Sequence, residues 1–213
     1  MPLRSVVARG LGHRFGEGNW LFRNLGLALI GGTLTGLVGP SGAGKSTLLS
    51  ILAGWVPPAE GSVERIGIDR LGWVFQNPHG VARRTAIDHV ALPLLARGLT
   101  RKEAERAAQA HLGEFNLTAV AKRVFSELSG GEAQRLMLAR AVAAQVDLLL
   151  VDEPTAQLDR SAADTVNAVL SSLASRDMIV VVATHDPHTR AACQTVIDLS
   201  AGADERPDAG LTP

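Results

Sequence analysis

The sequence predicts an α/β fold with a mostly parallel sheet, a small antiparallel β lobe and an inserted helical lobe. Three observations lead to this prediction. Apolar strand-like segments alternate with helical segments after residue 145, and a glycine-rich turn joins a strand-like segment to a helical one near residue 40. Between these two parts, residues 85–144 follow a helical pattern. Near-continuous apolar strands that alternate with helices are typical of a parallel sheet with both faces covered.

Short strand-like segments broken by glycine make up most of the N-terminal part. They cover residues 5–8, 21–30, 33–38 and, further along, 61–76. The stretch 25–44 carries no charge and has the length of a bilayer span. Seven glycines and Pro40 interrupt it, so we expect two buried strands there and no membrane segment.

A helix is expected to follow the glycine-rich turn, over residues 45–54, because Gly54 and the prolines beyond it are stop signals. In the helical part, Thr100 and Glu103 have capping-box spacing, and apolar residues recur behind them at helical intervals. The last elements expected are a strand at 148–151, a helix at about 161–175, and strands at 178–184 and 196–199.

These elements form one expected domain, residues 1–199, with a helical lobe at about 80–144 and a flexible tail at 200–213. Hydrophobic residues make up 46% of the chain, and 21 basic residues balance 21 acidic ones. This balance excludes a protein that binds nucleic acid or an anionic membrane through bulk charge. Cys193 is the only cysteine, so no intrachain disulfide is possible and a cytosolic location is the default.

The strongest motif is the segment GPSGAGKS at residues 39–46. It fits the phosphate-binding pattern of two glycines separated by four residues and followed by Lys and Ser. In such a loop, backbone N–H groups and the N-terminus of the next helix surround the β- and γ-phosphates of a nucleotide. Lys45 would place its charge on the phosphates, and the Ser46 hydroxyl would bind Mg²⁺. The predicted nucleotide-binding residues are Gly39, Pro40, Ser41, Gly42, Ala43, Gly44, Lys45, Ser46 and Thr47. A simple glycine-rich turn is the alternative, which the strand before and the helix after it disfavour.

Two carboxylates follow the strand predicted at 148–151. Asp152 stands at the C-terminal end of that strand, where α/β sheets place their ligands, and we expect it to orient the metal. Glu153 comes next and would point in a different direction, toward an attacking water, as the general base or water-positioning group. The alternative is a pair of solvated loop carboxylates.

A second glycine motif, LSGGE at residues 128–132, precedes a helical segment. Ser129 and Glu132 have capping-box spacing, so the N-terminus of this helix is also suited to an anion. With these motifs in this order, the sequence resembles the ATP-binding subunits of ABC transporters over about residues 3–199. LSGGE resembles their signature motif, GPSGAGKS their Walker A motif and LLLVDE their Walker B motif. The resemblance implies a P-loop NTPase fold, an ATPase activity and the cofactors ATP and Mg²⁺.

The resemblance also implies roles for single residues near the nucleotide. Phe15 matches the aromatic residue that stacks on adenine. The alternative is a core phenylalanine, with Trp20 as a nearby competitor for the stacking position. Gln76 matches the Q-loop glutamine that senses the metal and the attacking water, and Asp159 matches the D-loop residue that touches the opposite subunit.

His185 matches the switch histidine that contacts the γ-phosphate. Its alternative is a metal site with Asp186, His188 and Cys193, which lacks the spacing of a zinc motif. The resulting assignments are catalytic roles for Glu153, His185 and Gln76, and metal contacts for Ser46, Gln76 and Asp152.

In the family that the sequence resembles, the signature segment of one chain completes the P-loop site of another. The resemblance thus implies a dimer, preferably of identical chains, in which one subunit contacts the ATP held by the partner. The residues making that contact would be Leu128, Ser129, Gly130, Gly131, Glu132 and Asp159. It also implies an integral membrane permease docked at residues 76–97 and a position on the cytoplasmic side of the membrane. No nucleic acid partner is expected, because the charges balance.

Residues 85–95, TAIDHVALPLL, are similar to the equivalent segment of lipoprotein-releasing and macrolide-exporting ATP-binding subunits. This similarity favours export or membrane extraction. The sequence also departs from the family pattern. The stretch 61–76 is shorter than expected, so the antiparallel lobe should be reduced, and Glu132 stands where many members have glutamine.

Three other functions compete with a transporter subunit. A regulatory ABC pair would signal through a membrane partner without moving cargo. A soluble ABC machine acting on DNA or ribosomes would usually carry a coiled-coil insert, a second nucleotide-binding unit or a basic face. A small-molecule P-loop kinase would have no reason to carry LSGGE together with Gln76 and His185.

Overall fold

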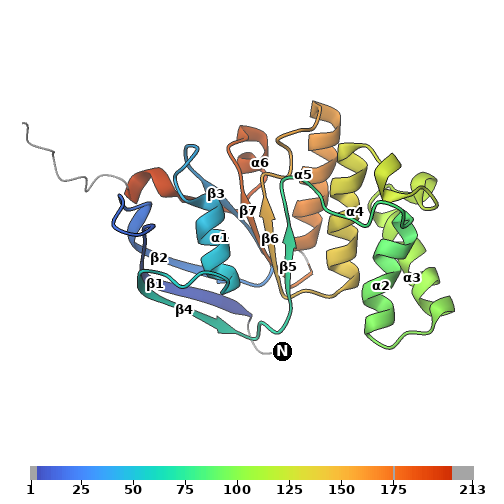
Figure 1. The fold of residues 1–213 in the computed structure, drawn as a ribbon, viewed down its shortest axis with the longest axis horizontal. Coiled ribbons are helices and arrows are strands. Elements are labelled where there is room, and N and C mark those ends of the chain that lie inside the picture. The colour runs from blue at the N-terminus through green and yellow to red at the C-terminus, as the bar shows by residue number, and fades with distance from the viewer. Residues whose placement is uncertain (1–3, 175, 203–213) are drawn as a thin grey trace, which may run out of the picture.

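A five-stranded parallel sheet forms the centre of the computed structural model, which describes residues 4–174 and 176–202. The strand order is β5-β6-β7-β3-β8, and each neighbouring pair is parallel. These strands are β3 (Thr33–Val38), β5 (Leu71–Val74), β6 (Leu148–Asp152), β7 (Ile179–Ala183) and β8 (Thr195–Asp198). Figure 1 shows this sheet between a β lobe and a helical lobe, which confirms the predicted architecture.

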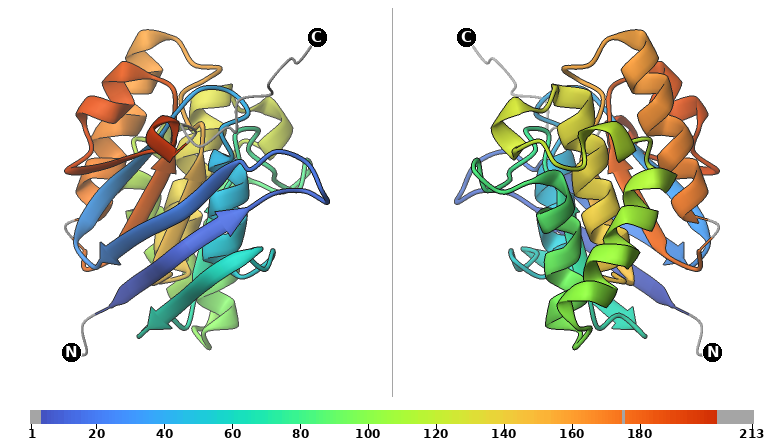
Figure 2. Two further views of the ribbon diagram at one scale, coloured as in Figure 1. Left: turned by 90° about the vertical axis from the view of Figure 1, so that its left-hand side faces the viewer. Right: turned by 90° about the vertical axis from the view of Figure 1, so that its right-hand side faces the viewer.

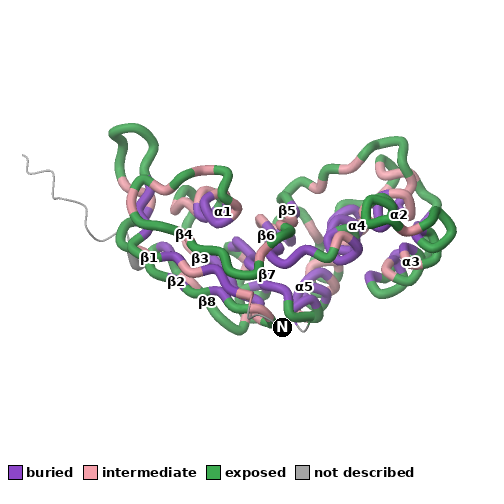
Figure 3. Tube along the Cα trace, turned by 90° about the horizontal axis from the view of Figure 1, so that it is seen from below, coloured by how far each residue is buried: buried purple, intermediate pink, exposed green. Residues whose placement is uncertain are grey.

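Successive side chains of a strand point to opposite faces of a sheet. In the middle strands β6 and β7 nearly every side chain is buried, so both faces of the sheet are covered there. In β6, Leu148 and Leu150 pack in one cluster with α1 (Lys45–Ala53). Leu149 and Val151 pack on the other face, with α4 (Gly130–Ala143) and α5 (Arg160–Ala174). This two-sided burial explains the near-continuous apolar composition of the strands, and Figure 3 shows it as buried stretches through β6, β7 and the inner helices.

A three-stranded antiparallel sheet covers the other side of α1, in the order β2-β1-β4. Its strands are β1 (Ser5–His13), β2 (Phe22–Ile30) and β4 (Glu60–Ile66). Val6, Leu11 and Phe22 of this sheet join the apolar face of α1 in one buried cluster. The left view of Figure 2 shows the sheet in front of α1, which is therefore enclosed between two layers.

The C-terminal end of α1 is joined to the antiparallel sheet by polar contacts. Gly54 ends the helix in the left-handed conformation, with φ 79°, as the sequence predicts. The Arg65 guanidinium of β4 donates hydrogen bonds to the carbonyl oxygens of Ile51 and Leu52, at 2.9 and 2.8 Å. Carbonyls in the last turn lack the usual N–H partner four residues on, and Ile51 accepts from Gly54 N–H at 3.0 Å instead. The Arg65 cation adds to this and complements the helix dipole.

The helical lobe contains α2 (Ala86–Ala96), α3 (Arg101–Glu114) and the outer face of α4. The predicted capping box of Thr100 and Glu103 begins α3 and is confirmed. A similar box of Thr85 and Asp88 begins α2. Two short 3₁₀ segments, Thr118–Val120 and Phe125–Glu127, connect α3 to α4, and the right view of Figure 2 shows α2 and α3 side by side.

The structure differs from the predicted elements in several places. β1 runs to His13 instead of residue 8, because its second half pairs with β2 and β4 across irregularities in register. The helix α6 (Pro187–Ala191) was not predicted, since five residues are too few to show an apolar period. Most of the predicted tail at 200–213 lies outside the described residues, as does Ser175 at the end of the predicted helix 161–175.

In the described part of the chain, no helix is long and apolar enough to cross a bilayer. The uncharged stretch at 25–44 contains part of β2, all of β3 and the glycine-rich turn. This confirms the interpretation of that stretch as strands. The expected burial holds for β3, whereas β2 is buried on one face only, because it belongs to the outer antiparallel sheet.

Candidate nucleotide-binding site

The glycine-rich turn at residues 39–44 connects β3 to α1, and its backbone requires glycine. Gly42 and Gly44 have φ angles of 82° and 91°, which side chains rarely adopt. A Cβ on Gly44 would also lie 3.0 Å from the Leu21 Cβ and 3.1 Å from the Phe22 ring. Among the described residues no side chain caps the N-terminus of α1. The N–H groups of its first turn are therefore available to an anion, as the motif predicts.

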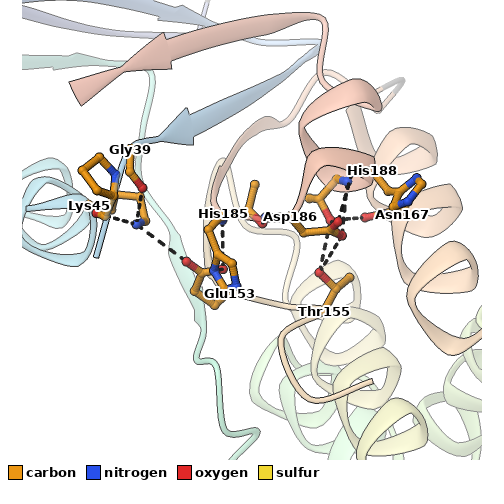
Figure 4. A network of polar contacts seen from close by, with 11 residues as sticks. Gly39, Lys45, Glu153, Thr155, Asn167, His185, Asp186 and His188 are labelled. Carbon is orange, nitrogen blue, oxygen red and sulfur yellow. Dashed lines mark hydrogen bonds and ion pairs between the residues drawn. The ribbon is translucent and has the colours of Figure 1, made fainter. Parts of the chain in front are cut away.

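Lys45 lies at the start of α1 and is 8% exposed. Its ammonium group donates hydrogen bonds to the carbonyl oxygens of Gly39 and Pro40, at 2.9 and 3.2 Å. The same Nζ lies 3.8 Å from Glu153 Oε1 across the site (Figure 4). The ammonium group that we expect to bind the phosphates is thus held at the glycine-rich turn, beside the Glu153 carboxylate.

Asp152 ends β6 next to the start of α1. Burial is the main influence on its carboxyl group and raises its pKa, and the negative charge of Glu153 raises it further. A hydrogen bond from the Ser46 side chain and the positive charge of Lys45 lower the pKa. The net result is a pKa above the ordinary value, so the negative charge of Asp152 is poorly compensated. A cation placed between Asp152 and the Ser46 hydroxyl would relieve this cost.

These two oxygen ligands suit Mg²⁺, which commonly keeps one or two protein ligands and completes its shell with phosphate and water oxygens. Within residues 4–174 and 176–202, no group of three or more His, Cys, Asp or Glu residues could hold a metal ion. The alternative cluster around His185 has other contacts: the Cys193 thiol donates to the Thr189 carbonyl, and Asp186 accepts bonds from two threonine side chains.

Glu153 directly follows β6 in a left-handed conformation, with φ 44°. The two carboxylates have different hydrogen-bond partners: Asp152 accepts from the Ser46 side chain, whereas Glu153 contacts Lys45 and His185. Glu153 Oε2 accepts a hydrogen bond from the His185 backbone N–H at 3.2 Å and lies 2.9 Å from His185 Nδ1. Figure 4 shows Glu153 between Lys45 and His185, so three predicted site residues from three elements meet.

A polar network behind His185 was not anticipated from the sequence. Asp186 caps α6 and accepts hydrogen bonds from the backbone N–H groups of His188 and Thr189 and from the hydroxyls of Thr155 and Thr189. Thr189 Oγ1 also lies 3.0 Å from Asn167 Oδ1 on α5 (Figure 4). Burial alone would raise the pKa of Asp186, but these hydrogen bonds outweigh it and lower the pKa. The network joins the segment after β7 to the segment after β6. Thr155 lies 31 residues from Asp186 in the sequence and Asn167 lies 22 from Thr189, and contacts between such distant residues leave no periodic pattern.

The second glycine motif lies in a separate cleft. Ser129 caps α4: its hydroxyl accepts a bond from the Glu132 N–H, and Glu132 Oε2 accepts one from the Ser129 N–H at 2.7 Å. This confirms the predicted capping box. Asp159 caps the start of α5, where Ala162 N–H donates to Oδ1 at 2.9 Å. The structure thus brings most of the predicted signature and D-loop residues to one cleft of about 450 Å³, lined by Ser129, Gly130, Gly131, Glu132, Gln157 and Asp159, among others. Leu128 does not line this cleft, because its apolar side chain packs against the core.

The two sets of predicted site residues do not meet within one chain. The P-loop precedes α1 beside the antiparallel sheet, whereas the signature segment precedes α4 in the helical lobe (Figure 1). Among the described residues, no hydrogen bond or ion pair joins residues 128–132 to residues 39–47. The P-loop residues and the signature residues therefore lie in two separate places on the described part of the chain.

Gln76 follows β5 and is exposed. Its neighbour Asn77 accepts a hydrogen bond on Oδ1 from Gln157 Nε2, at 2.9 Å. Gln157 lies between Glu153 and Asp159, so this bond links the predicted Q-loop to the predicted D-loop. Neither Asn77 nor Gln157 was singled out from the sequence, because nothing in their spacing indicates the contact.

Phe15 lies in the turn between β1 and β2 and is 65% exposed, which excludes the alternative of a core phenylalanine. Its ring makes one edge-to-face contact, with His13 at 5.0 Å. Trp20 carries the Arg14 and Arg23 guanidinium groups over its ring, at 4.8 and 4.7 Å. A base could therefore stack on Phe15 more readily than on Trp20.

A family model described as ABC transporter matches residues 22–156. The chain belongs to the ABC transporter family. The match contains the Walker A, signature and Walker B motifs predicted above, and the chain is an ABC ATPase cassette with the P-loop NTPase fold.

Among relatives of this ABC cassette, an uncharacterized ABC transporter ATP-binding protein of Mycobacterium bovis is 38% identical over 82% of this chain. The chain spans 58% of that protein's length. The lipoprotein-releasing system ATP-binding protein LolD of Chromohalobacter salexigens is 36% identical, over 84% of this chain and 82% of that protein. The macrolide export ATP-binding/permease protein MacB of Rhodopseudomonas palustris is 32% identical, over 95% of this chain and 34% of that protein. These relatives confirm the predicted similarity to lipoprotein-releasing and macrolide-exporting subunits.

A solved structure agrees with the fold. It is the dimeric structure of a post-hydrolysis state of an ATP-binding cassette bound to ADP and Pi. It superposes on this ABC chain with a TM-score of 0.78 and 29% sequence identity, covering 94% of this chain and 97% of its own.

Proposed function

We propose that this chain hydrolyses ATP as one half of a dimer and that the cycle drives a separate membrane permease in export or in extraction of a lipid or lipoprotein. The observation that carries the proposal is the division of the site into two halves. An uncapped helix N-terminus with Lys45 lies in one place, and the cleft of Ser129 and Asp159 lies in another. The dimeric solved relative with ADP and Pi supports a site completed between two subunits.

In the proposed reaction, the N–H groups before α1 bind the phosphates, and Lys45 turns from the Gly39 and Pro40 carbonyls toward them. Ser46 and Asp152, with Gln76, would hold Mg²⁺, which supplies charge neutralisation at the phosphates. Glu153 accepts a proton from, or orients, the attacking water. His185 holds Glu153 through its backbone N–H and Nδ1, which keeps the carboxylate aimed at the site.

Complementation between two inactive variants tests the shared site. Lys45→Ala removes the phosphate-binding cation, and Ser129→Arg places a large cation in the signature cleft. Each variant alone should be nearly inactive. A mixed dimer of the two retains one intact site, so an equal mixture should recover about a quarter of the wild-type rate if dimers form at random. An ATPase assay of the mixture against each variant alone measures this. No recovery would contradict a site shared between chains.

The proposed docking surface lies on the helical lobe. Two adjoining clefts there share Arg84 and Leu92. Val81, Leu92 and Leu95 are exposed along them, within the residues 76–97 that the sequence suggests as a dock. Arg140 of α4 lines the same surface. The rim carries both charges, from Arg84, Arg101 and Arg140 and from Asp88 and Glu105. Exposed apolar side chains inside such a rim suit an amphipathic segment of a permease. This partner would hold the chain at the cytoplasmic face of the membrane.

A charge placed on this surface tests the docking proposal. Leu92→Glu should leave the ATPase rate of the isolated chain unchanged and reduce the fraction that sediments with membranes of the source cells. Ile66→Glu is the matched control, because Ile66 is 44% exposed, close to the 43% of Leu92, but lies on β4. Equal sedimentation of the two variants would contradict the assignment of the dock to α2.

A further inference from the structure

His89 of α2 is 3% exposed, and both of its ring nitrogens contact the backbone. Its Nε2 accepts a hydrogen bond from the Val81 N–H at 2.9 Å. Its Nδ1 lies 2.8 Å from the Thr85 carbonyl oxygen. A carbonyl can only accept, so the proton of the neutral ring must sit on Nδ1. These two bonds fix one tautomer and one orientation, and they tie the loop before α2 to the helix.

The loop before α2 is also hydrogen-bonded to the 3₁₀ segment that begins at Phe125. The N–H groups of Phe125 and Ser126 donate to the carbonyl oxygens of Arg84 and Ala82, at 2.9 and 3.1 Å. This pairing holds the later part of the loop independently of the imidazole. Val81 comes before the paired part, and its N–H is bonded to His89. The Val81 carbonyl oxygen accepts a hydrogen bond from the Arg84 N–H at 2.9 Å. The imidazole therefore holds the other end of this residue, its N–H, and with it Gly80 on the preceding side.

These residues line the proposed dock. His79, Gly80, Val81, His89 and Leu92 face the same cleft of about 190 Å³. Gly80 lies against the Phe125 ring, where an added Cβ would be 2.4 Å from a ring carbon, and Phe125 packs against His89 with ring centroids 5.3 Å apart. A movement of the imidazole is thus transmitted to the wall of the cleft and to Val81, which is 57% exposed.

The charged groups around His89 come from three elements. Arg84 lies in the loop, Asp88 on α2 and Arg140 on α4, while the ring from the 3₁₀ segment is the uncharged Phe125. His79 lines the same cleft. The pKa of His89 is lowered below 6.5, mainly by burial and to a lesser extent by the charges of Arg140 and Arg84. The bond to the Thr85 carbonyl and the charge of Asp88 act in the opposite direction and raise the pKa.

We propose that neutral His89 is a clamp that holds Gly80 and Val81 in the shape required for docking, and that protonation of the ring releases them. A proton on Nε2 would face the Val81 N–H, so donor would meet donor and the bond would be lost. The unfolded or released form binds the proton more readily than the clamped form. The clamp is therefore complete above about pH 6.5 and is weakened as the pH falls from there through the lowered pKa. This inference rests on the proposed function of the α2 surface as a dock.

Nuclear magnetic resonance of the full chain tests the clamp itself. Ring nitrogen shifts should show the Nδ1–H tautomer for His89 at pH 7.5 and a titration midpoint below that of a free histidine. The hydrogen-exchange protection factor of the Val81 amide should fall by up to about tenfold per pH unit between pH 6.5 and the midpoint. The Phe125 amide, bonded to Arg84, is the internal control and should not follow this fall. An Nε2–H tautomer, or parallel behaviour of the two amides, would overturn the clamp.

A second measurement connects the clamp to docking. His89→Asn keeps a donor and an acceptor in one side chain but does not titrate. Wild-type sedimentation with source-cell membranes should decrease between pH 7.5 and the midpoint that the ring nitrogen shifts give for His89, whereas that of His89→Asn should stay constant over the same range. Equal pH dependence of the two proteins would overturn the regulatory role even if Leu92→Glu confirms the dock. If neither protein binds membranes at any pH, the proposed dock itself has failed, whatever the spectra show.

Discussion

Glu153→Gln is expected to bind Mg-ATP, form a stable dimer and lose turnover by a factor on the order of 10² to 10⁴. Glutamine keeps the size of the side chain and an oxygen that can accept from the His185 N–H. It cannot take a proton from water, and it removes the negative charge that lies 3.8 Å from Lys45. Binding of Mg-ATP and formation of the dimer should therefore persist, whereas ATP hydrolysis, which loosens the dimer, should be lost.

Sizing chromatography with Mg-ATP and an ATPase assay on the same preparation measure both effects. Glu64→Gln is the control, because Glu64 forms an exposed pair with Arg9 on the antiparallel sheet, away from the site. That variant should elute and turn over as the wild type does. A Glu153→Gln protein that stays monomeric and hydrolyses ATP at the wild-type rate would contradict the assigned role.

Asp147→Ala is expected to destabilise the fold by about 3 kcal/mol, because it removes a buried, charged acceptor that two backbone N–H groups and the Arg4 guanidinium share. Asp147 Oδ2 accepts from the N–H groups of Asp69 and Arg70, at 3.0 and 2.9 Å, and Oδ1 lies 2.9 Å from Arg4 Nη2. One carboxylate thus joins the residues that precede β1, β5 and β6. Thermal unfolding should shift down by about 6–12 °C in a chain of this size.

Two comparison variants separate this effect from a general loss of charge. Asp147→Asn keeps one acceptor oxygen, so its loss of stability should be smaller. Glu64→Ala removes an exposed ion pair and should change stability by less than about 1 kcal/mol. If Asp147→Ala unfolds at the same temperature as Glu64→Ala, the three-way contact contributes nothing measurable.

Much of the fold could be predicted because its elements carry local signals. The glycines of residues 39–44 are required by backbone angles and by close approach to Phe22, and both requirements appear as a spaced motif. The strands β6 and β7 are apolar on both faces, which distinguishes them from the half-buried strands of the antiparallel sheet. The capping boxes at Thr100 and Ser129 were predictable because both partners lie within one turn.

The remaining features depend on contacts between distant segments. Asp186 joins Thr155 across 31 residues, Asn77 joins Gln157 across 80, and Asp147 joins Asp69 across 78. A single aspartate or asparagine has the same local pattern whether it is solvated or buried in such a contact. The importance of His89 was hidden for the same reason, since its apolar surroundings come from another segment, at Phe125.

The sequence alone determined the family, the two glycine motifs and the carboxylates after β6, because phosphate binding requires particular residue types at fixed spacing along one segment. The tertiary structure decided which of these residues meet: Lys45, Glu153 and His185 in one place, Ser129 and Asp159 in another. That division follows from the path of the chain, because the parallel sheet brings the ends of β3, β6 and β7 together while the inserted helical lobe carries the start of α4 away from them.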